Sequence, residues 1–85
     1  MHIHLRFFAH LREMLGTSEE ILFVPESVFN VGDIRQLLIA RGGVWADALS
    51  EQHTLHTAYN HTHCDAQTLV SDQCEVAFFP PVTGG

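Results

Sequence analysis

One amphipathic helix set between strand-like segments constrains the fold of this chain most. The segment "NVGDIRQLLIARGG" (30–43) starts at Asn30, whose side chain can cap a helix, and Asp33 follows where it favours the positive end of the helix dipole. Gly42 and Gly43 are expected to end the helix. Its apolar positions form a single stripe: Val31, Ile34, Leu37 and Leu38. A helix with one apolar stripe packs across one face of another element.

Alternating segments at both ends of the chain predict half-buried strands. In "HIHLRFF" (2–8) the inward positions are Ile3, Leu5 and Phe7, and the outward positions are His2, His4, Arg6 and Phe8. In "CEVAFFP" (74–80) the inward positions are Cys74, Val76 and Phe78, and the outward positions are Ala77 and Phe79. Phe8 and Phe79 therefore fall on the same outer face, where exposed aromatic side chains suggest a partner surface.

The remaining segments complete the predicted order of elements. A short helix over 9–16 stops at Gly16, and a strand over 19–26 stops at Pro25 and pairs with the first strand as an antiparallel edge. A helical turn over 44–52, a strand over 54–61 and a turn or short strand over 61–65 follow. This order predicts an α+β fold of the β-grasp, ubiquitin-like kind, with one main helix across one face of a mixed sheet. We expect one domain over 1–79 and a flexible tail over 80–85.

Composition excludes several classes of function. The net charge of -6 argues against a nucleic-acid partner and favours a protein partner with a basic face. No apolar stretch is long enough to span a membrane. The N-terminus lacks the features of a signal peptide, so we expect a cytoplasmic protein. In that compartment Cys64 and Cys74 are expected to be reduced thiols.

The end of the chain, "FFPPVTGG", carries no charged or nucleophilic side chain. Pro80 and Pro81 cannot donate ladder hydrogen bonds, so the sheet ends there. The following residues are slim enough to thread a narrow channel: Val82, Thr83, Gly84 and Gly85. The terminal carboxylate of Gly85 is the functional group of this segment, and it becomes a good electrophile after activation as an anhydride with AMP. A frayed end is the alternative interpretation of Gly-Gly alone.

The two ends of the chain together resemble the MoaD family, the small subunits of molybdopterin synthase. The matching blocks are "EVAFFPPVTGG" and "LRFFAHLREMLG", while "DIRQLL" and "WADAL" match that family in pattern. The resemblance implies a ubiquitin-like sulfur carrier that is not catalytic by itself. It also implies that Phe8, Arg12 and Phe79 face a partner protein.

The resemblance further implies a set of partners. An E1-like adenylating enzyme, similar to MoeB, would activate Gly85 with ATP and Mg²⁺, and a sulfur donor protein would convert the carboxylate to a thiocarboxylate. The carrier would bind a MoaE-like large subunit as a heterotetramer and insert its tail (80–85), where the sulfur passes to a pyranopterin precursor of the molybdenum cofactor. No cofactor is expected on this chain itself.

Three alternatives stay open at this point. The chain could be a carrier for thiamine synthesis or tRNA thiolation, or a ubiquitin-like modifier. A histidine-rich metal-binding module is the third, because His53, His56, His61 and His63 gather near Cys64. Their spacing fits no closed tetrahedral motif, so we predict no metal site and interpret them as surface residues of a hairpin.

Overall fold

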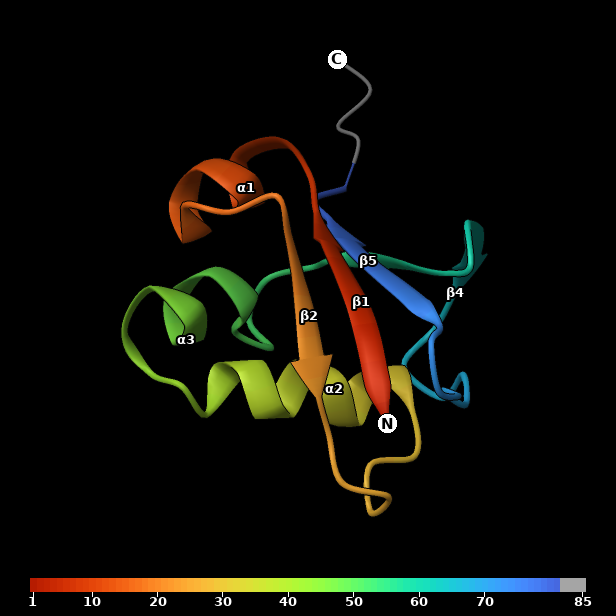
Figure 1. Cartoon of the computed structure of the whole chain (residues 1–85). Helices are drawn as coiled ribbons and strands as arrows, with labels where there is room; N and C mark the ends of the chain where they lie inside the picture. Colours follow the sequence, from red (N-terminus) through yellow and green to blue (C-terminus); the bar gives the residue numbers. More distant parts are fainter. Residues whose placement is uncertain (82–85) are drawn as a thin grey trace.

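A mixed sheet forms the frame of the protein, and the computed structural model describes residues 1–81. Across this range the sheet has five strands in the order β2-β1-β5-β3-β4 (Figure 1). The bounds are β1 His2–Phe7, β2 Glu19–Phe23, β3 His56–Tyr59, β4 Thr62–Cys64 and β5 Glu75–Phe79. β1 and β5 are parallel, and the other neighbouring pairs are antiparallel. The predicted β-grasp fold is confirmed, including the antiparallel edge formed by β2 and β1.

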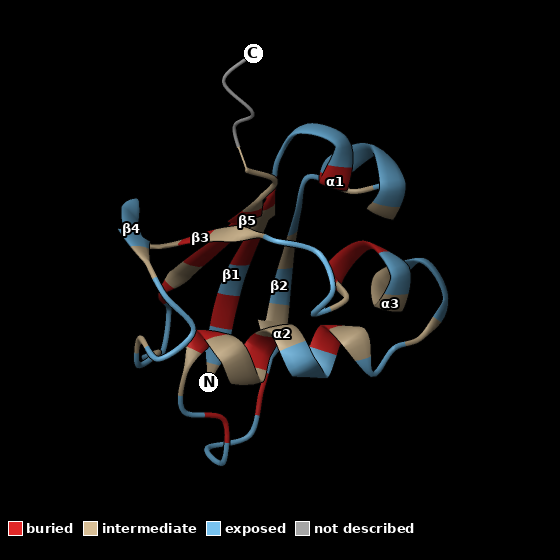
Figure 2. Cartoon of the chain, turned by 180° about the vertical axis from the view of Figure 1, so that it is seen from behind, coloured by how far each residue is buried: buried red, intermediate tan, exposed pale blue. Residues whose placement is uncertain are grey.

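The helices lie to one side of the sheet and leave its other side open (Figures 1 and 2). Their bounds are α1 Ala9–Leu15, α2 Val31–Ile39 and α3 Gly43–Leu49. Between the helices and the sheet lies one buried cluster, to which β1, α2 and the segment 74–78 contribute most: Ile3, Leu5, Phe7, Val31, Ile34, Leu38, Cys74, Val76 and Phe78. The inward positions predicted from the two alternating strands are all buried.

Helix α2 begins as the sequence predicts. The Asn30 side chain accepts a hydrogen bond from the Asp33 N–H (2.8 Å), and the Asp33 carboxylate accepts from the Asn30 N–H (3.3 Å), which together form a capping box. The helix ends at Ile39, before the two glycines, and Gly43 already belongs to α3. Gly42 has φ 77°, so it supplies the left-handed turn that separates the two helices.

One predicted burial state is wrong. Leu37 was expected in the apolar stripe of α2 but is 39% exposed, because the helix rests on the sheet along the row of Val31, Ile34 and Leu38 and turns Leu37 outward. Ala77 points to the outer face, as predicted, because its register partners are Arg6 on β1 and Ala58 on β3. Its small side chain in the central strand is nevertheless only 5% exposed.

The two cysteines do not form a disulfide: Cys74 is buried in the core and Cys64 is half-buried on β4. Within residues 1–81, none of the helices has the length and apolar character needed to cross a bilayer.

Candidate functional site

Strand β5 delivers the chain to the tail from the centre of the sheet. It is hydrogen-bonded on one side to β1 and on the other to β3, up to the pair of Phe79 with His56. Pro80 and Pro81 follow directly and leave the sheet near α1 (Figure 1). The other predicted tail residues, Val82, Thr83 and Gly84, and the predicted reactive residue Gly85 lie outside the described residues.

A shallow hollow lies at the base of the tail. It has a volume of about 280 Å³ and is formed by α1, by the loop that follows α3 and by the two tail prolines. Its lining is mostly apolar and includes His10, Met14, His53, Thr54, Leu55, Pro80 and Pro81. The described part of the tail therefore borders this hollow together with side chains from two other segments of the chain, α1 and residues 48–55.

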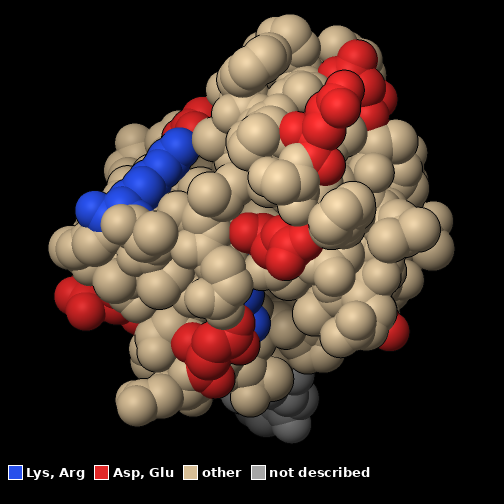
Figure 3. Space-filling model, turned by 90° about the horizontal axis from the view of Figure 1, so that it is seen from below, with Lys and Arg blue, Asp and Glu red and all other residues tan. Residues whose placement is uncertain are grey.

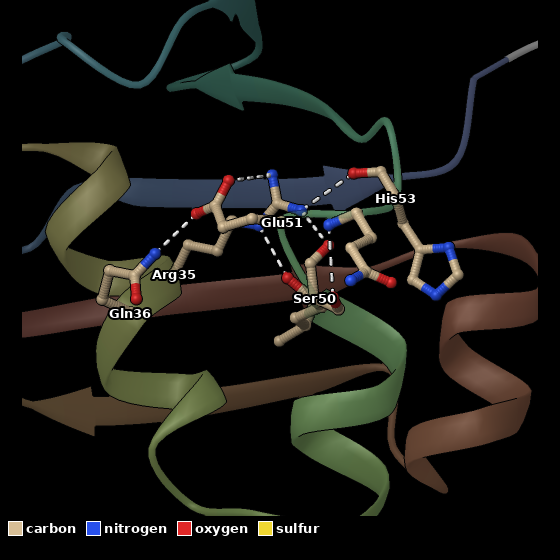
Figure 4. A network of polar contacts seen from close by, with 7 residues as sticks. Arg35, Gln36, Ser50, Glu51 and His53 are labelled. Atoms are coloured by element: carbon tan, nitrogen blue, oxygen red, sulfur yellow. Dashed lines mark hydrogen bonds and ion pairs between the residues drawn. The ribbon is translucent and has the colours of Figure 1, made fainter.

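Arg35 on α2 holds the loop that borders this hollow (Figure 4). Its guanidinium donates to the carbonyl of Leu49 (2.8 Å), to that of Ser50 (2.6 Å) and to that of His53 (3.0 Å). The Glu51 carboxylate lies 3.7 Å from the same guanidinium. Carbonyls at a helix end lack partners within the helix, so one arginine satisfies the end of α3 and orders the chain up to His53.

Two aromatic side chains meet on the outer face of the sheet beside the tail. The Phe8 and Phe79 rings pack edge to face with centroids 6.4 Å apart. Phe8 is 38% exposed and Phe79 is half-buried. The Phe8 N–H donates to the Phe78 carbonyl (3.2 Å), which ties the start of α1 to the end of β5. The structure thus brings together two of the predicted interface residues at the point where the tail leaves.

Arg6 and His56 border this aromatic pair, and both were missed as parts of the site. The Arg6 guanidinium lies 5.3 Å from the centre of the Phe8 ring, and the His56 ring stacks on Phe79 at 5.8 Å. The outward phase of Arg6 was visible in the alternation of β1. The contact of His56 with Phe79 depends on the pairing of β3 with β5, which the sequence pattern does not specify.

Arg12, the third predicted interface residue, lies exposed on α1. Arg6, Arg35 and Arg41 each lie within ion-pair distance of a glutamate. Across residues 1–81, Arg12 has no carboxylate at that distance. An exposed guanidinium without an internal partner is suited to an acidic group on another molecule.

The end of the molecule opposite the tail exit carries more acidic than basic side chains (Figure 3). Figure 3 shows carboxylates spread among uncharged side chains over the end of the molecule opposite the tail exit. At that end the Asp72 carboxylate accepts a hydrogen bond from the His2 N–H (2.7 Å), which lowers the pKa of Asp72. On β2, the Glu20 carboxylate pairs with Arg41 (2.9 Å) and raises the pKa of that arginine. These groups are engaged within the fold, and none of them lines the hollow at the base of the tail.

The histidine-rich hairpin does not assemble a closed metal site in the part of the chain that the structure describes. No group of three or more His, Cys, Asp or Glu side chains there is arranged to hold an ion. His53 borders the hollow at the tail, His61 lies 3.4 Å from Glu75, and His56 contacts His63. The histidines that are close in sequence are therefore distributed over different surroundings.

Comparison with known proteins agrees with this arrangement. The molybdopterin synthase sulfur carrier subunit of Escherichia coli is 41% identical over 83 residues, and that of Haemophilus influenzae is 35% identical over 83 residues. Each alignment covers 98% of this chain and 99% of the relative.

Among solved structures, a chain in the complex of subunits 1 and 2 of the molybdopterin-converting factor from Helicobacter pylori matches with a TM-score of 0.68 and 19% identity. That match covers 100% of both chains and supports the fold. The model of the ThiS family matches residues 5–85, which include the whole of the predicted tail. With two nearly full-length relatives beside it, this match shows that the chain belongs to the ThiS family.

Proposed function

We propose that this chain is the sulfur carrier subunit of a molybdopterin synthase. The observation that carries the proposal is the 41% identity to such a subunit over nearly the whole of both chains. The geometry supports it, since β5 runs from the sheet centre into a proline-led tail flanked by an outward aromatic pair. The chain supplies a scaffold and an end group, and partners supply the catalytic machinery.

The proposed chemistry takes place at the carboxylate of Gly85. A carboxylate oxygen attacks the α-phosphorus of ATP on an E1-like enzyme, with Mg²⁺ on the departing pyrophosphate, and gives an acyl adenylate. The outer sulfur of a persulfide on the donor protein then attacks the acyl carbon and AMP leaves, which gives an acyl disulfide between the two proteins. A second thiol attacks the donor's sulfur and breaks the sulfur–sulfur bond, which releases the thiocarboxylate and leaves the donor sulfur in a disulfide with that thiol. The thiocarboxylate sulfur is a good nucleophile toward a pyranopterin precursor, and hydrolysis of the acyl–sulfur bond returns the carboxylate.

The described residues of this chain would provide docking and delivery. The Phe8–Phe79 pair and Arg12 would bind the large subunit, and the net charge of -6 suits a partner with a basic face. The two prolines would then direct the last residues away from the carrier into the partner's active site. The Helicobacter pylori complex of subunits 1 and 2 is the precedent for such a pair.

The intact mass of the protein tests the proposal. The full chain is incubated with an E1-like enzyme, ATP, Mg²⁺ and a sulfur donor. We expect a gain equal to the exchange of one oxygen for one sulfur, mapped by fragmentation to Gly85 and absent from a variant that lacks Gly85. Co-purification with a molybdopterin synthase large subunit then identifies the pathway against thiamine synthesis and tRNA thiolation.

The half-buried thiol of Cys64 requires a matched control. A sulfur donor could add a whole sulfur atom to this thiol as a persulfide, which gives a larger mass gain than the exchange of oxygen for sulfur. The Cys64→Ser variant removes that route and should still show the exchange at Gly85. If the mass gain disappears in Cys64→Ser and persists without Gly85, the carrier proposal is wrong.

A further inference from the structure

Two histidines are paired across the β3–β4 hairpin. His56 Nδ1 and His63 Nε2 lie 3.2 Å apart, with ring centroids separated by 5.4 Å. Residues Ala58 and His63 are directly opposite in the antiparallel register, so His56 is the diagonal neighbour of His63 on the same face. Both rings lie on the outer face of the sheet, since the β5 partners of His56 and Ala58 are Phe79 and Ala77.

The separation of the two nitrogens suits a shared metal ion. Nitrogen ligands lie 2.0–2.1 Å from zinc, so two of them at angles between a right angle and the tetrahedral angle are about 2.8–3.4 Å apart. The observed 3.2 Å falls within this interval. When no ion is bound, one ring donates its N–H to the other. An ion takes the place of that proton when both rings carry their hydrogens on the opposite nitrogens.

The backbone fixes this pairing before any ion binds. Asn60 and His61 both have positive φ (46° and 72°), as in the two-residue turn that closes a tight hairpin. Asn60 also anchors the hairpin to β5, since its N–H donates to the Glu75 carbonyl (2.9 Å) and its side chain accepts from the Glu75 N–H (2.8 Å). On its other side His56 stacks on Phe79. Both ligands are thus carried by paired strands, and one ring is already oriented by its neighbour.

In contrast to the prediction of no metal site from their spacing in the sequence, we propose that His56 and His63 form an open, two-ligand site for a divalent transition-metal ion of the zinc type. Imidazole nitrogen is a ligand that zinc, nickel and copper prefer. The net charge of -6 favours cation binding at the surface. The described residues supply no third ligand, so water or a donor from a docked molecule completes the coordination. An ion here lies beside Phe79, at the base of the tail.

Two other possible metal ligands of the same hairpin, His61 and Cys64, make different contacts. His61 faces Glu75, whose carboxylate also lies 3.6 Å from Arg6, so that oxygen donor is already engaged by a cation. Cys64 follows His63 but turns to the opposite face, where its thiol contacts the Thr57 hydroxyl at 3.4 Å. His61 and Cys64 are therefore matched controls: they belong to the same hairpin and lie outside the proposed ligand pair.

Calorimetric titration of the full chain with Zn²⁺ tests the site. We expect one ion per chain in the original protein and in the His61→Gln and Cys64→Ser controls, with dissociation constants within about twofold of each other. Loss of a residue that merely supports a metal ligand costs about 10–100-fold in affinity. We therefore expect His56→Gln and His63→Gln each to weaken binding at least about tenfold.

Two-dimensional amide NMR spectra of each variant establish that the fold is retained, and the histidine ring C–H signals locate the ion. We expect Zn²⁺ to shift the ring signals of His56 and His63 and to leave those of His10 in place. The proposal is overturned if the original protein binds no Zn²⁺, if both His56→Gln and His63→Gln bind as the original does, or if a control variant loses binding equally.

Discussion

At the scale of single residues, the two cysteines offer an internal comparison of burial. Cys74 is 3% exposed, and burial raises the pKa of its thiol. Because the thiolate is the nucleophile, Cys74 should be nearly inert in the folded protein. We expect iodoacetamide at neutral pH to alkylate Cys64 first and to reach Cys74 only as the chain unfolds, as measured by peptide mass spectrometry over time.

The Cys64→Ser variant makes this comparison quantitative. It should remain almost unlabelled under native conditions and take up one alkyl group in denaturant. Equal native rates at Cys64 and Cys74 would contradict the assignment of Cys74 to the core. The alternation with Val76 and Phe78 already predicted this burial from sequence. The contact between His56 and His63 could not be predicted in the same way, because it depends on the hairpin register that the Asn60–His61 turn sets.

At the scale of elements, the capping box of α2 links a local sequence signal to the core. Removing the cap in Asn30→Ala leaves the Asp33 N–H without its acceptor, and such losses cost roughly 0.5–2 kcal/mol of unfolding free energy. The whole domain should lose this amount, because α2 carries Val31, Ile34 and Leu38 into the core. Urea unfolding followed by circular dichroism measures the difference.

Gln36→Ala is the matched change on the exposed side of the same helix: it removes an exposed hydrogen bond to Glu51 but no cap, and we expect it to alter the unfolding free energy by less than about 0.5 kcal/mol. If both variants lose the same amount, the cap is not the cause. The start of α2 could be predicted from the sequence, because a side-chain cap marks where a helix begins and apolar residues repeated every 3.6 positions indicate the helix that follows. The end of α2 and the exposure of Leu37 depend on how much of the helix is covered by the sheet and by α3. The spacing of residues within the helix carries no information about that coverage.

At the scale of the whole molecule, the open face of the sheet has two aromatic ends. Phe8 and Phe79 lie beside the tail, whereas Phe23, on the edge strand β2, is 71% exposed and packs only edge-on against His2. Phe23 and His2 are register partners, so Phe23 lies on the outer face but at the other end of the strands. The ThiS-family carrier proposed here should use the end that holds the tail.

This difference in position predicts which aromatic residue matters for docking. We expect Phe8→Ala to weaken binding to a molybdopterin synthase large subunit by at least about 1 kcal/mol, as truncation of a central interface aromatic does. Phe23→Ala removes the same side chain from the same face and should leave the affinity unchanged within about 0.5 kcal/mol. Calorimetry of each purified variant with the large subunit measures both values. Equal losses would indicate contact across the whole face, and a loss confined to Phe23→Ala would place the partner at the end of the sheet away from Pro80 and Pro81, where it could not receive the tail directly.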